Sequence, residues 1–142
     1  MTVLVVHAAA TWVMVGLIWT VQVVHYPLFA LVGRPQFPAY EAEHTRRMGY
    51  LVAGPWALEA VTGLLLLLAP PRDASRWWVV ADLSALAVTI AVTLVASVPA
   101  HRRLGAAFDP RAHRALVLTN WIRTAAWTGC GAVVLVLVAT SR

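Results

Sequence analysis

The sequence has no lysine, a single cysteine and few charged residues of either sign. All eleven basic residues are arginine, and charged residues make up only 12% of the 142 positions. Cys130 has no second cysteine with which to form a disulfide or a cysteine metal motif, so we expect a packed, inert thiol. Because 61% of the residues are hydrophobic, a soluble domain of this size could not bury all the apolar surface.

Long apolar runs occupy most of the chain. They cover residues of about 3–31, 50–69, 77–98 and 116–140, and each reaches the ~20 residues that a helix needs to cross a bilayer. Helices are favoured because they satisfy their own backbone hydrogen bonds in lipid. The sequence therefore predicts an all-α integral membrane four-helix bundle, as one transmembrane domain over residues 1–142. A polar helical segment is expected at about 38–48, before the second span.

The arginines predict the orientation of this bundle. Three lie in the first loop and four in the third, whereas only Arg72 and Arg76 flank the short second loop. By the positive-inside rule, the first and third loops face the cytoplasm and both termini lie on the outer side. We expect a multi-pass protein of a bacterial cytoplasmic (inner) membrane. Its net charge of +5 then reflects topology and contact with anionic lipid, and not nucleic-acid binding.

Prolines and glycines predict where the helices bend or end. Gly49 and Gly54-Pro55 are points where the second helix could bend. Pro99 is expected to end the third helix. The third loop, about residues 100–115, then contains a turn at Asp109-Pro110.

Polar residues interrupt each apolar run, and each of them is expensive at membrane depth. His7 and His25 are eighteen positions apart and would share one face of a regular helix. Similar polar stripes occur on the other three helices, and the simplest packing turns all four stripes inward. His7 and Asp82 are predicted toward the outer side, where they could form a simple satisfied pair.

Four side chains are predicted to meet near the cytoplasmic side. His25 ends the first helix, Glu41 and His44 precede the second, and His101 follows the third. Imidazoles and a carboxylate at one depth suit a transition metal, iron or copper. The Glu41-x-x-His44 spacing recurs in carboxylate-bridged di-metal bundles.

Other interpretations of these four residues stay open. Two histidines could hold a haem axially. Glu41, Glu43 and His44 could equally form a solvated segment beside arginines, and His101 could bind lipid headgroups.

Four further residues are expected to act on a substrate or to orient ligands. Tyr26 and Asn120 would do so through hydrogen bonds, and Arg123 would attract an anionic or enolate group. Glu59, near the middle of the membrane, is expected to pair with Arg123, either for chemistry or as a structural ion pair.

Three stretches of the chain, Trp19–Phe29, Gly54–Glu59 and Asn120–Thr124, resemble a group of small bacterial four-helix membrane proteins without an assigned function. More distantly, the size of the chain and the histidine near the end of the first helix resemble the anthrone oxygenase-like family. That resemblance implies oxidation of a lipophilic or aromatic substrate within the bilayer. It identifies no catalytic residue.

These observations together predict a membrane-embedded, metal-dependent oxidoreductase that acts on a lipophilic or aromatic small molecule. One alternative is a small proton-coupled transporter, with a polar path from His7 and Asp82 through Glu59 to His25. Four helices form a narrow bundle, so a transporter of this kind would need a homodimer. The other alternative is a haem-binding or structural subunit of a larger membrane complex.

Overall fold

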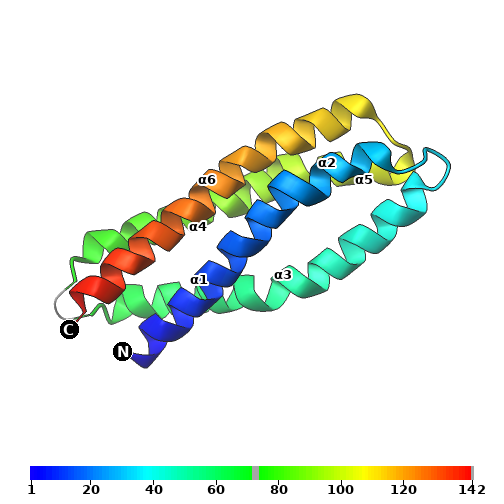
Figure 1. Cartoon of the computed structure of the whole chain (residues 1–142). Helices are drawn as coiled ribbons and strands as arrows, with labels where there is room; N and C mark the ends of the chain where they lie inside the picture. The colour runs from blue at the N-terminus through cyan, green and yellow to red at the C-terminus, as the bar shows by residue number, and fades with distance from the viewer. Residues whose placement is uncertain (72–73, 142) are drawn as a thin grey trace.

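The computed structural model describes residues 1–71 and 74–141, and every regular element in these ranges is helical. Arg72 and Asp73, which the sequence places in the second loop, lie outside the described residues. Within the described ranges, four helical segments are long and apolar enough to cross a membrane. They form one elongated bundle with both chain termini at the same end (Figure 1). The predicted all-α four-helix architecture is confirmed.

Two of the four segments contain a π-helical turn. The first segment consists of α1 (Thr2–Thr20), the π-helix η1 (Val21–His25), α2 (Tyr26–Leu28) and the 3-10 turn η2 (Phe29–Leu31). The third consists of α4 (Arg76–Val92), the π-helix η3 (Thr93–Ser97) and α5 (Val98–Ala106). The second and fourth are the unbroken helices α3 (Phe37–Leu68) and α6 (Pro110–Thr140).

Each π-helical turn ends two residues before a proline. Pro27 and Pro99 are the second residues of α2 and α5. Because proline has no N–H, a regular α-helix would lose a hydrogen bond at these positions, and a wider turn lets the helix continue. The prediction that Pro99 ends the third helix is therefore wrong, since this helix runs on to Ala106. His101 consequently lies on a helix and not in a loop.

The connection after α5 is much shorter than the sequence suggested. Only residues 107–109 separate α5 from α6, because α6 already begins at Pro110. The Asp109 side chain accepts a hydrogen bond from the Arg111 backbone N–H at 2.8 Å, and Pro110 occupies the first helical turn. An aspartate cap followed by proline is a strong start signal for a helix. The expected turn at Asp109-Pro110 is thus the beginning of α6.

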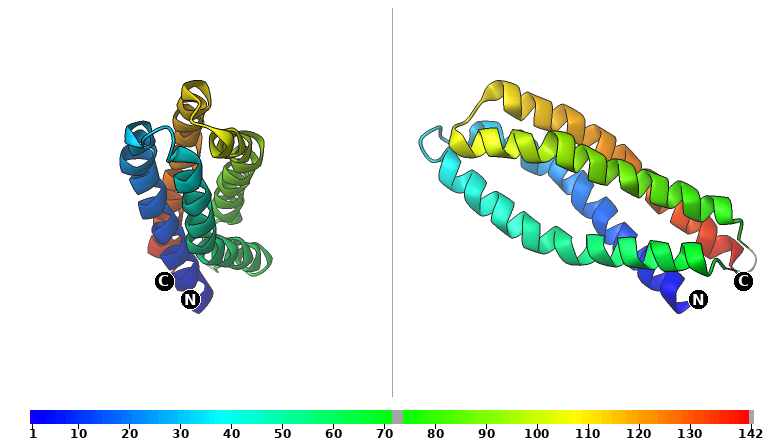
Figure 2. Two further views of the ribbon diagram at one scale, coloured as in Figure 1. Left: turned by 90° about the vertical axis from the view of Figure 1, so that its right-hand side faces the viewer. Right: turned by 180° about the vertical axis from the view of Figure 1, so that it is seen from behind.

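The helices pack in the cyclic order α1, α3, α4, α6, and α3 also packs against α5. α3 passes through Pro55 without a break and curves along its length (Figure 2). The polar stripes face inward as expected: His7, Glu59, Asp82 and Asn120 are at most 1% exposed. Leucine and valine side chains cover much of the outside. A polar interior under an apolar surface is the arrangement that helices need in lipid.

Gly63 allows α3 to approach α1 and α4 closely. A Cβ atom at this position would lie 2.8 Å from Leu83 Cδ2 and 3.3 Å from His7 Cε1. We expect Gly63→Leu to destabilise the bundle by about 1–3 kcal/mol through overpacking, measured as a lower melting temperature in detergent. Gly54→Leu is the matched control on the same helix, because nothing lies within 4 Å of a Cβ there. If both variants lowered the melting temperature equally, the close approach of α3 to α1 and α4 at Gly63 would be contradicted.

Candidate functional site

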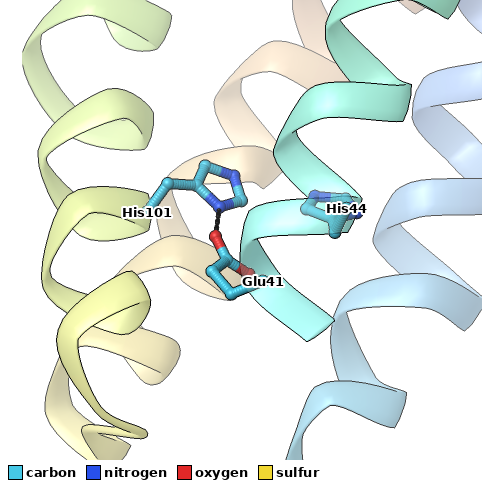
Figure 3. Close-up of side chains that lie close together, drawn as sticks. All are labelled: Glu41, His44 and His101. Atoms are coloured by element: carbon cyan, nitrogen blue, oxygen red, sulfur yellow. Dashed lines mark hydrogen bonds and ion pairs between the residues drawn. The ribbon is translucent and has the colours of Figure 1, made fainter. Parts of the chain in front are cut away.

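A buried carboxylate and two imidazoles meet between α3 and α5. Glu41 and His44 project from α3 toward His101 on α5 (Figure 3). Ligand atoms from the three residues all lie within 4.8 Å of one another. Glu41 is only 1% exposed and His44 8% exposed. We refer to Glu41, His44 and His101 as the Glu/His/His group; its mixed oxygen and nitrogen donors suit a first-row transition metal.

His101 is held by hydrogen bonds at both ring nitrogens. Its Nδ1–H donates to Glu41 Oε1 at 2.5 Å, and its Nε2 accepts from the Tyr26 hydroxyl at 3.0 Å. The Tyr26 hydroxyl thus helps to fix the orientation of the His101 ring, and the role of His101 as a ligand stays a prediction. The second carboxylate oxygen of Glu41, Oε2, is buried and has no hydrogen-bond partner among the described residues.

His25 lies beside the Glu/His/His group and is not a member of it. The hydrogen bond between His25 Nε2 and His44 Nδ1 is 2.7 Å long, so His25 is placed to fix the orientation of the His44 ring. Two imidazoles that are hydrogen-bonded directly leave no room for a haem plane between them. This pair therefore does not favour the axial haem arrangement.

The opposite face of α3 at this level has an ordinary charged surface. The Glu43 side chain is 44% exposed and accepts hydrogen bonds from Arg46 at 2.9 and 2.6 Å and from Arg47 at 2.5 Å. The interpretation as a solvated segment beside arginines thus fits Glu43. It does not fit Glu41 and His44, which are buried inside the bundle.

Asn120 links Arg123 on α6 to the first segment. Its Oδ1 accepts from Arg123 Nη1 at 3.0 Å, and its Nδ2 donates to Gln22 Oε1 at 2.8 Å. Gln22 in turn donates to the backbone carbonyl of Val117 at 3.4 Å. Asn120 thus orients Arg123 and contacts none of the residues of the Glu/His/His group through these bonds.

The ion pair expected between Glu59 and Arg123 is not formed. Trp127 contacts both side chains instead. Its Nε1–H donates to Glu59 Oε2 at 3.0 Å, and the Arg123 Cζ lies 5.3 Å from the Trp127 ring centroid. Cation–π attraction and a neutral donor therefore replace the direct pair. Trp127 is completely buried.

A cavity of about 500 Å³ lies next to the Glu/His/His group. All three members of the group line it, together with Tyr26 and Arg123. Most of the other lining residues are apolar and come from α1, α3 and α6, among them Met14, Ile18, Val52, Trp56 and Trp127. Protein pockets for small molecules have volumes of roughly 300–1,000 Å³ and mainly apolar walls. The cavity therefore suits a lipophilic small molecule.

Sequence reasoning gave no role to His113, which the structure places beside the site. Its Nε2–H donates to the backbone carbonyl of Tyr26 at 2.8 Å. This contact helps to fix the backbone from which the Tyr26 side chain reaches His101. The sequence held no signal for it, because His113 was expected in a loop and lies on α6.

A second buried polar cluster lies toward the end of the bundle that holds the termini. His7 Nε2 and Asp82 Oδ2 are 3.1 Å apart, which confirms the expected pair. The other ring nitrogen of His7 is hydrogen-bonded to Thr62 Oγ1 at 2.8 Å. The oxygen Asp82 Oδ1 has no hydrogen-bond partner among the described residues.

No protein-family model, curated protein or solved structure matches this chain.

Proposed function

We propose that this chain is a multi-pass protein of a bacterial cytoplasmic membrane that oxidises a lipophilic or aromatic small molecule at a bound transition metal. One observation carries the proposal: three residues with metal-ligand chemistry lie in the wall of an apolar cavity of suitable size. The four long apolar helices support the membrane location. The arginines of the first and third loops support termini on the outer side.

The residues present fit a metal ion. Glu41 Oε2 accepts hydrogen bonds only, and it is buried without a partner among the described residues, a costly state that a bound cation would relieve. Glu41, His44 and His101 would hold the ion, and iron or copper would supply redox chemistry. His101 would bind the ion through Nδ1 in place of its hydrogen bond to Glu41, and its Nε2–H would then donate to the Tyr26 hydroxyl. His25 would orient the His44 ring through its Nδ1.

The proposed reaction removes two electrons and two protons from a substrate in the cavity. Dioxygen is the co-reactant: it takes up both electrons and both protons and leaves as hydrogen peroxide. The apolar residues that line the cavity would contact the apolar part of the substrate, and its oxidisable group would lie beside the Glu/His/His group. We do not propose transport, because an apolar cluster of Leu4, Leu66, Val79 and Leu137 packs at the end beyond the His7–Asp82 pair.

The purified protein is expected to bind about one iron or copper ion per chain, measured by elemental analysis after equilibrium dialysis. Glu41→Gln should weaken the binding about 100-fold or more, and His25→Ala about 10- to 100-fold, since outer hydrogen-bonding partners tune metal affinity. Glu43→Gln is the matched control, because Glu43 is on the same helix but faces outward. It should bind metal like the wild type.

Two results would end the metal proposal. One is a wild-type protein that binds neither metal more tightly than Glu41→Gln does. The other is a metal-free preparation that still consumes dioxygen with a lipophilic hydroquinone such as 1,4-dihydroxynaphthalene at the rate of the metal-loaded protein.

A further inference from the structure

Arg123 is a buried cation without a counter-ion among the described residues. It is 9% exposed, and no carboxylate among the described residues lies within 4.0 Å of its nitrogens. Its close neighbours are the Asn120 amide, the Trp127 ring and the Tyr26 hydroxyl. Because a buried charge is costly unless it is paired, this arginine calls for an anionic partner from outside the chain.

Three residues that line the cavity have polar atoms without a partner. These atoms are Nε of Arg123, Nε1 of Trp56 and Oγ of Ser97, each buried and unbonded within the part of the chain that the structure describes. Guanidinium and indole N–H groups donate hydrogen bonds and accept none. A molecule that satisfies both must therefore carry hydrogen-bond acceptors, such as carboxylate or phenolate oxygens.

The walls around these donors suit a flat ring system. The Trp56 and Trp127 rings lie 5.5 Å apart between centroids at an interplanar angle of 64°, and both line the cavity. Met14 and Met48 line it as well. Aromatic rings pack favourably against tryptophan edges and faces, and methionine adapts to irregular apolar shapes.

We propose that the cavity binds a lipophilic aromatic acid, a carboxylate or an ionised phenol, with its anionic oxygens at Arg123 and Trp56. This inference names the substrate class of the proposed oxidation. Only the identification of the bound ligand as the substrate rests on that proposed function. The recognition itself uses Arg123, Trp56 and Ser97, and none of them belongs to the Glu/His/His group.

The test is binding of 2-naphthoate and of its neutral analogue 2-naphthamide to the full-length protein in detergent after treatment with EDTA. Equilibrium dialysis against a detergent blank gives both dissociation constants. The wild type should bind the anion about 10- to 100-fold more tightly than the amide, the size of one charge-assisted hydrogen bond. Metal removal makes the result independent of the metal-binding measurement, so the two proposals can fail separately.

Variants locate the source of this preference. Arg123→Met should bind both compounds equally, and Arg123→Lys, which keeps the charge and protects the fold, should keep part of the preference. Trp56→Phe should weaken binding of both compounds several-fold by removing one donor. Arg103→Met is the matched control, since Arg103 is an exposed arginine on α5 that does not line the cavity. It should leave the preference unchanged.

Three outcomes would overturn the proposal. They are equal binding of the two compounds by the wild type, a preference that survives in Arg123→Met, and a preference that is lost in Arg103→Met. Dodecanoate is the aliphatic comparison, expected to bind more weakly than 2-naphthoate. Tighter binding of dodecanoate would assign the cavity to a fatty acyl chain and contradict the aromatic class.

Discussion

Replacing Trp127 with alanine is expected to destabilise the bundle by about 3–5 kcal/mol, the usual cost of truncating a large buried aromatic side chain. Trp127 is 0% exposed and packs with Met14, Val15 and Ile18 of α1. Truncation also removes the N–H that donates to Glu59 Oε2, so that neither oxygen of this buried carboxylate would have a partner among the described residues. Unfolding followed by circular dichroism in a detergent titration measures the loss.

Two comparison variants make the Trp127 experiment specific. Trp121→Ala removes the same side chain from the same helix at a position that is 46% exposed, and it should cost much less. Trp127→Phe keeps most of the packing but removes the indole N–H, so its loss should be intermediate and reflect the orphaned Glu59. If Trp121→Ala and Trp127→Ala were equally destabilised, Trp127 would not be the packing centre of the bundle.

Asp82→Ala is expected to destabilise the bundle by a similar amount, about 3–5 kcal/mol, because it breaks a buried pair and strands the other member. His7 would lose the acceptor 3.1 Å from its Nε2, at a site where neither residue is more than 1% exposed. The same detergent titration measures the change in the free energy of unfolding.

The double variant His7→Leu/Asp82→Leu is the informative comparison for this pair. Replacing both buried partners by apolar residues is often nearly neutral, since no polar group then remains unpaired. The double variant should therefore be more stable than Asp82→Ala alone. If the double variant lost as much stability as the single variants His7→Leu and Asp82→Leu lose together, the two side chains would not interact and the pairing would be wrong.

The sequence predicted the bundle and its polar interior well, for a physical reason. A polar side chain is costly in lipid, so His7, Glu59, Asp82 and Asn120 could only be tolerated on inward faces, and all four are buried. The spacing of residues along one helix also predicted correctly which of them share a face. Glu41 and His44, one helical turn apart, do face the same partner across the bundle.

Partner choice across the bundle could not be predicted from the sequence. Glu59 and Arg123 lie on the expected inward faces, but Trp127 contacts both of them in place of a direct pair. Burial and depth indicate which residues can meet. They do not indicate which of several neighbours forms the hydrogen bond, because differences of an ångström decide that choice.

The position of His25 shows a second limit of sequence periodicity. His7 and His25 were assigned to one helix face on the assumption of 100° per residue. The π-helical turn Val21–His25, which includes His25, changes that register. His7 is fully buried, whereas His25 is only partly buried and contacts His44 from the side of the Glu/His/His group. The proline at position 27 was visible, but its effect on the turn before it was not.

The two π-helical turns make residue count as important as residue identity. A π-helical turn holds one more residue than an α-helical turn, so a regular α-helix with the same number of residues in place of η1 or η3 would rotate everything beyond it by roughly 100°. Tyr26 and His101 would then no longer face each other, although the sequence would still contain every residue of the site. A homologue with a regular α-helix in place of either turn should keep the chemistry only if it is one residue shorter there.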